Sequence, residues 1–355
     1  MSITTIYTQN ILQGIQELLN AANLQKLVRP GMKVSVKPNL VLAKPPELGA
    51  TTHSEVIEGI ICFLQDLGVN NIEIIESAWI GDDTKRAYRV CGYERLTKKY
   101  GVPFYDLKDD RTCKIDAGKY IFDICRKAVE TDFLINVPVL KAHCQTRLTC
   151  NLKNLKGCIS DGEKRRFHTL GLHGPIAYLN KAIPTHFCVV DGICGDLTFE
   201  EGGNPVTRNM LMAGTDPLLL DSYCAKLIGY HADEIEYLRI ASEIGVGELY
   251  GDNASVLELN ADVKPLRPAK ADSGAVRRLA AHINEDKACS ACYAALIYAL
   301  HQSRGVLKAK INIGQGFRGK AGVLGCGSCA GKHERFVPGC PPAAVDIIEF
   351  LEKKS

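Results

Sequence analysis

Short apolar runs alternate along most of the chain with segments of helical periodicity. The runs are rich in β-branched residues and end at polar, glycine or proline positions, which predicts buried strands at residues 33–40, 71–77, 133–140, 187–193 and 210–214. In residues 54–67 the apolar positions share one helical face, with Ser54 as the expected cap. A second helix is predicted at residues 216–229, where Asp216 is the expected cap and Pro217 takes the first helical position.

Strands that alternate with helices predict an α/β fold with a mainly parallel sheet and helices on both faces. We expect this body to occupy residues 1–265, with a ligand site at the carboxyl ends of its strands. Residues 262–272 combine prolines with basic residues, which is typical of a linker. A smaller cysteine-rich subdomain is predicted at residues 273–355, with helices near residues 292–301 and 343–353 around a glycine-rich loop at 314–331.

The overall charge narrows the classes of partner. A formal net charge of +3 in 355 residues is too small to favour nucleic acid or a membrane surface. No apolar run is long enough to span a bilayer, and the first ten residues do not resemble a secretion signal. We therefore expect a cytoplasmic protein that binds neither nucleic acid nor membrane.

The cysteines are unevenly distributed. Of fifteen, the ten from Cys62 to Cys224 are scattered, and we interpret them as small buried apolar residues. The other five crowd into the last part of the chain. Because disulfides are rare in the cytosol, clustered cysteines there indicate a metal site.

Three motifs in this last part predict a [4Fe–4S] cluster. They are Cys289-Ser-Ala-Cys292, Cys326-Gly-Ser-Cys329 within a glycine-rich loop, and Gly339-Cys340-Pro341. Glycines let the backbone approach sulfur closely and donate hydrogen bonds to it, and a cysteine before proline recurs in cluster-binding segments. The segment also has little apolar content to fold around, so a metal centre would stabilise it. The predicted ligands are Cys289, Cys292, Cys329 and Cys340.

Two alternatives to this ligand assignment stay open. A structural zinc site also uses two Cys-x-x-Cys pairs, although the gap between the pairs is long for a zinc ribbon and Cys340 would then be unused. Five cysteines compete for four positions, and Cys326 is set aside because Cys329 lies nearer the loop that leads to Cys340. Cys326 remains the alternative third ligand.

Polar residues follow the predicted strands, where an open parallel sheet binds its ligands. The candidates for binding an anionic ligand are Lys37, Asn39, Lys153, Asn154, Lys156 and Asp191. The candidates for catalysis are Lys141, His143 and His173, with His168 as a further histidine in the same basic stretch. Residues 164–166 are interpreted as a solvated loop face, and no nucleotide-binding glycine motif lies in a strand–helix context.

Several of these segments, taken in order, resemble the domain-of-unknown-function 362 family. They are Val36-Lys37-Pro38-Asn39-Leu40, Asn136-Val-Pro-Val-Leu-Lys141-Ala-His143, Leu152-Lys153-Asn154-Leu-Lys156-Gly157, Val190-Asp191-Gly192 and Ala213-Gly214-Thr215-Asp216-Pro217. The tail resembles the family variant that carries its own cluster segment, since the tightly spaced cysteines of a ferredoxin-like module are absent. The resemblance implies an iron–sulfur protein of the kind found largely in anaerobic microbes, but it implies no particular reaction.

The leading hypothesis is an iron–sulfur oxidoreductase. Its [4Fe–4S] cluster would pass electrons to an anionic substrate or a second cofactor at the rim of the sheet, and a redox partner protein would supply them. A flavin would be compatible with this scheme, although no motif indicates one. Two alternatives remain: an electron carrier or metal-handling accessory protein without its own substrate, and a non-redox enzyme with a structural cluster.

Overall fold

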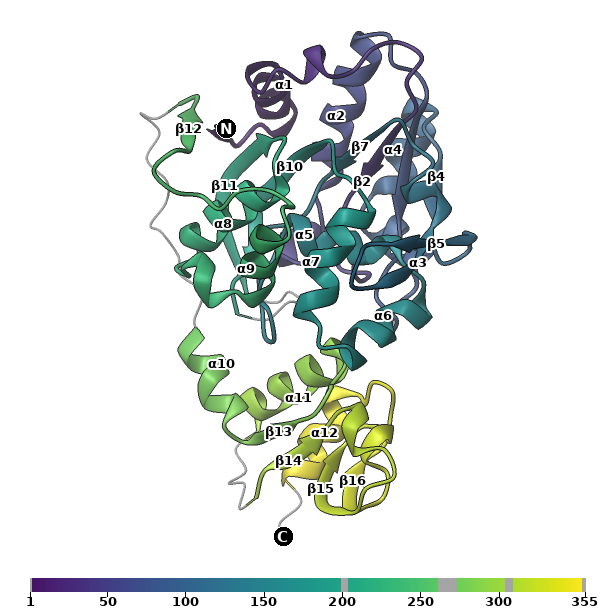
Figure 1. The fold of residues 1–355 in the computed structure, drawn as a ribbon, viewed down its shortest axis with the longest axis vertical. Helices are drawn as coiled ribbons and strands as arrows, with labels where there is room; N and C mark the ends of the chain where they lie inside the picture. The colour runs from purple at the N-terminus through teal and green to yellow at the C-terminus, as the bar shows by residue number, and fades with distance from the viewer. Residues whose placement is uncertain (1, 199–203, 261–272, 304–308, 353–355) are drawn as a thin grey trace.

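The computed structural model describes residues 2–198, 204–260, 273–303 and 309–352 (Figure 1). The linker expected at residues 262–272 lies outside the described residues. Within them, no helix is both long and apolar enough to cross a bilayer.

An eight-stranded sheet of order β12-β1-β11-β10-β7-β2-β3-β4 forms the centre of the body. Its strands are β1 (Ser2–Tyr7), β2 (Val34–Lys37), β3 (Ile72–Glu76), β4 (Phe104–Asp106), β7 (Phe133–Asn136), β10 (Phe187–Asp196), β11 (Pro205–Gly214) and β12 (Ser255–Glu258). Neighbouring strands are parallel except where β11 pairs with β10 and with β1, so β11 alone runs against the other seven. The predicted α/β fold with a mainly parallel sheet is confirmed.

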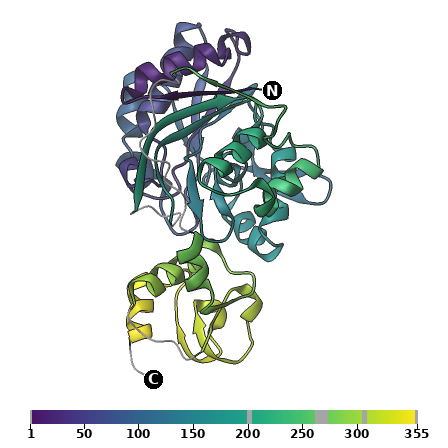
Figure 2. The same cartoon turned by 90° about the vertical axis from the view of Figure 1, so that its left-hand side faces the viewer.

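Helices cover both faces of this sheet (Figures 1 and 2). They are α1 (Ile11–Ala21), α2 (Ser54–Asp66), α3 (Thr84–Val90), α4 (Tyr93–Tyr100), α5 (Asn151–Asn154), α6 (Asp161–Thr169), α7 (His173–Ala182), α8 (Pro217–Leu227) and α9 (Glu236–Glu243). Successive residues of a strand serve opposite faces: Ile135 packs in the core under α1 and α2, and Leu134 in the core under α7 and α8. These strands are therefore apolar on both sides, which is why they appear as continuous apolar runs.

Capping residues set the starts of the two predicted helices. Asp216 accepts hydrogen bonds from the backbone N–H groups of Leu218 and Leu219, as expected for the cap of α8. The cap of α2 is His53 rather than Ser54, one residue earlier than the sequence suggested.

Two hairpins lie outside the central sheet: β5 (Thr112–Asp116) with β6 (Ile121–Cys125), and β8 (Lys141–His143) with β9 (Arg147–Thr149).

The cysteine-rich unit folds around a four-stranded sheet of its own. Its elements are α10 (Ser273–Ala280), β13 (Ile283–Glu285), α11 (Ser290–Gln302), β14 (Ile311–Ile313), β15 (Gly322–Cys326), β16 (His333–Val337) and α12 (Ala344–Glu352). The strands are all parallel in the order β13-β14-β15-β16. Leu296, Ile313 and Ile347 centre a separate hydrophobic cluster, so this unit has more of a core than its sequence suggested.

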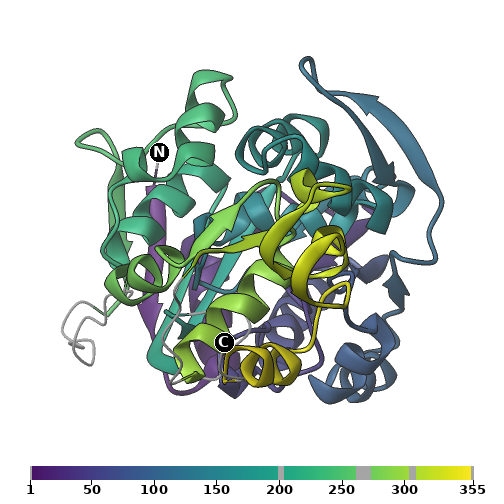
Figure 3. The ribbon, with the colours of Figure 1, turned by 90° about the horizontal axis from the view of Figure 1, so that it is seen from below.

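The two units meet where the parallel strands of the large sheet have their carboxyl ends. Figures 1 and 2 show the cysteine-rich unit beyond this edge, and Figure 3 views the body through it. Gln145, in the β8–β9 turn, donates a hydrogen bond to the carbonyl of Ala288 at 3.1 Å. The side chain of Gln315 donates to the carbonyl of Arg165 at 3.3 Å, which ties the loop after β14 to α6.

Candidate functional site

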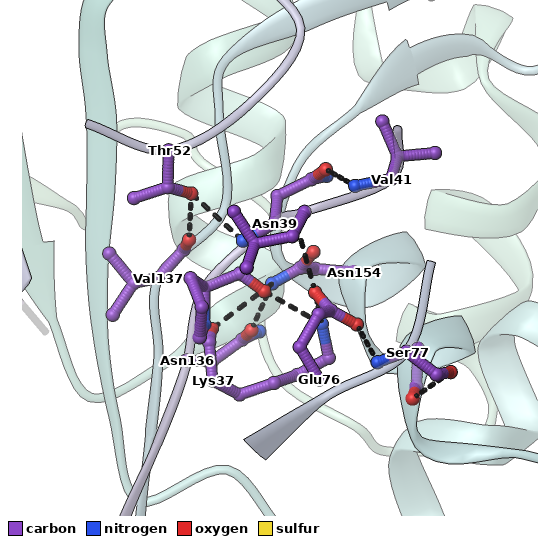
Figure 4. A network of polar contacts seen from close by, with 12 residues as sticks. Lys37, Asn39, Val41, Thr52, Glu76, Ser77, Asn136, Val137 and Asn154 are labelled. Atoms are coloured by element: carbon purple, nitrogen blue, oxygen red, sulfur yellow. Dashed lines mark hydrogen bonds and ion pairs between the residues drawn. The ribbon is translucent and has the colours of Figure 1, made fainter. Parts of the chain in front are cut away.

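A buried ion pair lies where β2 and β3 end. Lys37 Nζ is 2.8 Å from Glu76 Oε2, and neither side chain is more than 3% exposed. The remaining capacity of the carboxylate is filled by backbone N–H groups of Leu40 at 3.2 Å and Ser77 at 2.7 Å. Figure 4 shows this pair at the centre of a polar network. Because every partner is internal, Lys37 is committed to the structure of the sheet edge.

Asparagine side chains connect this pair to the next strand. Asn154 Nδ2 donates to Asn136 Oδ1 at 2.8 Å, and Asn136 Nδ2 donates to the carbonyl of Asn151 (Figure 4). Asn39 Oδ1 accepts from the N–H of Val41 and holds the loop after β2. The network fixes α5 against the ends of β2 and β7, so the basic stretch that follows has a defined position.

Gly157 is the point of closest approach between this stretch and the ion pair. A Cβ at residue 157 would overlap Glu76 Oε1 and lie 2.8 Å from Lys37 Nζ. The carbonyl of Gly157 also accepts a hydrogen bond from Ser77 Oγ at 2.7 Å. Only glycine lets the backbone lie directly against the buried pair.

Lys164 departs from its expected position on a solvated loop face. It lies in α6 with 6% of its surface exposed, because its Nζ donates to Ser77 Oγ at 2.7 Å and to the carbonyl of Ala78 at 2.8 Å. Burial lowers its pKa, although Asp161 at 3.1 Å opposes that shift. The sequence interpretation was wrong here because the helix folds back onto the end of β3.

A cavity of about 120 Å³ lies between these elements and the cysteine-rich unit. The residues that line it are Asn39, Val41, Leu42, Glu76, Ser77, Trp79, Ile80, Thr149, Lys153, Asn154, Lys156, Gly157, Lys164, His168, Cys289, Ser290, Ala291 and Ala294. The body therefore contributes residues from the carboxyl ends of its strands, as predicted for the ligand site of an open sheet. The amino-terminal end of α11 closes the other side, bringing Cys289 to the same cavity.

Lys153, Lys156, Lys164 and His168 form the basic wall of this cavity. Lys153 Nζ donates to Thr149 Oγ1 at 3.1 Å. Lys156 Nζ lies 3.5 Å from His168 Nε2. Lys156 and Arg165 are also close enough to Cys289 to oppose the rise in the pKa of that thiol that burial causes. Positive charge is thus concentrated on the part of the cavity lining near Cys289.

Four predicted binding residues line the cavity, namely Asn39, Lys153, Asn154 and Lys156. Lys37 lies behind Glu76. The three predicted catalytic residues do not line it. Lys141 is fully buried and donates to the carbonyl of Ala50 at 2.8 Å, while His143 Nδ1 accepts from two backbone N–H groups in the β8–β9 turn.

The third of these residues, His173, lies 3.9 Å from Glu236, and burial lowers the pKa of its ring.

Asp191, the remaining predicted binding residue, forms a separate buried pair. It accepts from His53 Nδ1 at 2.8 Å and from the backbone N–H of His53 at 2.8 Å. Burial opposes a charge on the His53 ring, but the carboxylate outweighs burial and raises the pKa of His53 to about 8. The pair fixes the start of α2 to β10 and does not line the cavity.

Three cavity residues, Glu76, Trp79 and Lys164, are not among the candidate binding and catalytic residues chosen from the sequence. Glu76 had a usable signal, because it ends a predicted strand as Lys37 does. Trp79 and Lys164 had none, since their positions depend on how the loop after β3 and helix α6 fold back.

The predicted cluster ligands gather around the loops of the cysteine-rich unit. Cys289 and Cys292 lie at the start of α11, and Cys329 lies in a short turn after β15. Hydrogen bonds from the N–H groups of Gly327 and Ser328 to the carbonyls of Val337 and Gly339, both 2.8 Å, hold this turn against the segment before Cys340. Cys329 and Cys340 consequently line one surface groove.

Burial and neighbouring charges both shift the pKa of these thiols. Burial raises the pKa of Cys289, and the charges of Cys329 and Cys340 raise it further. Among the described residues, no three His, Cys, Asp or Glu side chains surround a point as they would a single metal ion. The [4Fe–4S] cluster at these four cysteines therefore stays a prediction.

Hydrogen-bond donors and a glycine lie beside three of these thiols. Arg318 Nε donates to Cys329 Sγ at 3.4 Å, and Gln315 Nε2 donates to Cys289 Sγ at 3.7 Å. Gly327 has φ +84°, and a Cβ there would lie 3.8 Å from Cys292 Sγ. Cys326 is only 1% exposed in the core of the unit, and burial raises its pKa to about 12. It is nevertheless close enough to Cys292 to help raise the pKa of that thiol.

Comparison with known proteins places the body in a family. The family model described as "Domain of unknown function (DUF362)" matches residues 34–226, which is more than half of the chain. The chain belongs to this family. The matched segment contains β2 to α8, and hence every part of the cavity that the body contributes.

More distant similarity extends to two named proteins. The thylakoid-associated protein sll1697 of Synechocystis is 24% identical over 229 residues, covering 60% of this chain and 68% of the relative. The lactate racemase apoprotein of Thermoanaerobacterium thermosaccharolyticum matches with a TM-score of 0.41 and 15% identity. That match covers 63% of this chain and 57% of the racemase chain.

Proposed function

We propose that this DUF362 protein is an iron–sulfur oxidoreductase that acts on an anionic ligand held in the cavity at the carboxyl edge of its sheet. Cys289, Cys292, Cys329 and Cys340 would hold a [4Fe–4S] cluster. The observation that carries the proposal is that Cys289 lines the same cavity as Lys153 and Lys156. When bound, such a cluster supplies or accepts one electron at a time.

The residues of the body have separable tasks in this proposal. Lys153 and Lys156 bind the negative charge of the ligand, because their ammonium groups lie on the cavity wall. Lys156 Nζ, which lies 3.5 Å from His168 Nε2, can donate a proton to a ligand that gains electrons, and His168 Nε2 can accept a hydrogen bond from the same ammonium group. Lys37, Glu76 and Gly157 support this wall from behind.

The surface groove of the cysteine-rich unit supports the exchange of electrons with a partner. Cys329 and the exposed Cys340 line it together with Arg318 and Lys332. A basic rim beside the thiols suits a redox partner protein with an acidic surface. This groove is also the observation that favours the second candidate, an electron carrier without turnover of its own.

Serine variants of the cysteines test the proposal. We expect Cys289→Ser and Cys340→Ser, purified without oxygen, to lose most of the broad visible absorbance and the bound iron. Cys326→Ser is the matched control, because it changes a neighbouring cysteine of the same motif, and it should retain both. Full iron content in Cys289→Ser would remove the link between cluster and cavity, and loss of iron in Cys326→Ser would reassign the third ligand.

Ligand-dependent oxidation then separates the two candidates. In an oxidoreductase, Lys156→Met should slow oxidation of the reduced protein by a substrate while leaving exchange with an artificial electron acceptor unchanged. A carrier would show no effect of Lys156→Met on either reaction.

A further inference from the structure

The cavity has two chemically different walls. Lys153, Lys156, Lys164 and His168 form a basic wall built by α5, α6 and the turn between them. The other part of the lining is apolar and consists of Val41, Leu42, Trp79, Ile80, Ala291 and Ala294. A ligand that fills the whole space therefore needs an anionic end and an apolar end.

The charge balance favours one anionic group. Three lysines line the cavity against a single carboxylate, Glu76, which already forms its ion pair with Lys37. Lys164 is held in place by Ser77, Ala78 and Asp161. Lys153 and Lys156 also line the cavity, and their ammonium groups can bind an anionic ligand in addition to the partners that they already have. The amino-terminal end of α11 adds partial positive charge from the other side.

Two buried polar atoms at this cavity have unsatisfied hydrogen-bonding capacity. Trp79 Nε1 and Ser290 Oγ are both shielded from solvent, and neither has a hydrogen-bond partner among the described residues. An unsatisfied buried polar atom is costly, so such atoms are rare in native structures. Both residues line the cavity, and oxygen atoms of a bound ligand would supply the missing partners.

The size of the cavity limits the ligand further. An enclosed apolar cavity of roughly 150 Å³ accommodates benzene, a molecule of six non-hydrogen atoms. The present cavity of about 120 Å³ is partly open, so it favours a ligand whose inserted part is small without fixing the ligand's full length. An inorganic phosphate would fit by volume, but it would leave the apolar lining residues without a partner.

We infer that the cavity binds a short-chain monocarboxylate, with its carboxylate among Lys153, Lys156 and the donors Trp79 Nε1 and Ser290 Oγ, and its carbon chain against Val41, Leu42 and Ile80. This inference deepens the proposed function, because it names the substrate class of the same site. A carboxylate matches the lysines and the orphaned donors, while the carbon chain matches the apolar wall.

Trp79 provides a direct reporter of binding because it is the only tryptophan in the sequence. The full chain, purified without oxygen, would be titrated with butyrate, with its neutral isostere butyramide, and with inorganic phosphate. Binding would be followed by tryptophan emission and, independently, by calorimetry. We expect saturable binding of butyrate, and binding of butyramide and of phosphate weaker by about tenfold or more.

Variants assign the effect to the basic wall. Lys156 is only half-buried, so Lys156→Met should fold and should weaken butyrate binding by about tenfold, whereas Lys156→Arg should retain most of the affinity. Lys98→Met is the matched control, since Lys98 is exposed on α4 and does not line the cavity, and it should bind as the wild type does. Equal affinity for butyrate and butyramide, tighter binding of phosphate, or an unchanged affinity in Lys156→Met would overturn the inference.

Iron and sulfide analysis of the same sample separates this inference from the proposed function. A protein that contains the cluster but does not bind butyrate would overturn the inference alone. A protein that binds butyrate but contains no iron and sulfide would overturn the proposed function alone.

Discussion

Replacing Lys37 by methionine tests whether this lysine supports the site or binds the ligand. The substitution removes the charge and keeps much of the side-chain volume, so Glu76 would be left ionised with only the N–H groups of Leu40 and Ser77 as partners. Removing one partner of a buried ion pair typically costs about 3–5 kcal/mol, because the other charge stays buried without compensation. With both side chains at most 3% exposed, we expect a loss in this range.

Urea unfolding followed by far-UV circular dichroism measures this loss. With an m-value of about 3 kcal/mol per molar for a chain of this size, the midpoint should fall by about 1–1.7 M. The double variant Lys37→Met/Glu76→Gln removes both charges and should recover part of the stability. Lys98→Met, which breaks an exposed pair with Glu94, is the control and should unfold close to the wild type.

The reasoning would be refuted if Lys37→Met lost less than about 1 kcal/mol, since a buried compensated charge cannot be removed so cheaply. It would also fail if the double variant were as unstable as the sum of the single variants, because the two groups would then not be coupled. In the double variant, an affinity for butyrate close to that of the wild type would show that Lys37 does not contact the ligand.

Two further predictions concern the positions of His53 and Gly157. Because the folded pKa of His53, about 8, is raised above its ordinary value of 6.5, the stabilisation from its pair with Asp191 is complete below pH 6.5 and is lost as pH rises through 8. We expect the free energy of unfolding to fall by up to about 2 kcal/mol over this interval, and His53→Gln to lack that dependence; an equal fall in the variant would contradict the assignment. Gly157→Ala should cost about 1–3 kcal/mol and weaken butyrate binding, because its methyl group displaces the Lys37–Glu76 pair. Gly251→Ala, with open space around it, should change neither, and a wild-type midpoint and affinity in Gly157→Ala would show that the pair can move freely.

The fold could be predicted largely because the inner strands are apolar on both faces. The apolar runs that form β2, β3, β7 and β10 predict a buried parallel sheet from local sequence alone. The reversed direction of β11 and its pairing with β1 could not be predicted, because Thr4 pairs with Ala213 across two hundred residues. Pairing at that separation depends on the whole fold and leaves no local pattern.

The site was predictable only in part for the same reason. Asn39 and Lys153 were found because they follow strands or lie in the basic stretch that continues from one. Lys141 belongs to the same stretch, yet its β8 strand turns it inward to the carbonyl of Ala50. Lys164 reaches the cavity only because α6 folds back, and Cys289 does so only because the two units dock at this edge.

The central claim is that the cysteine-rich unit brings an iron–sulfur cluster to the edge of the cavity. Its most direct test is iron and acid-labile sulfide analysis of the protein purified without oxygen, together with electron paramagnetic resonance of the dithionite-reduced sample. The account predicts about four irons and four sulfides per chain and a signal from the reduced protein. Zinc without sulfide would contradict it. The cysteine-rich unit would then hold a structural zinc ion, and the cavity would have no redox centre beside it.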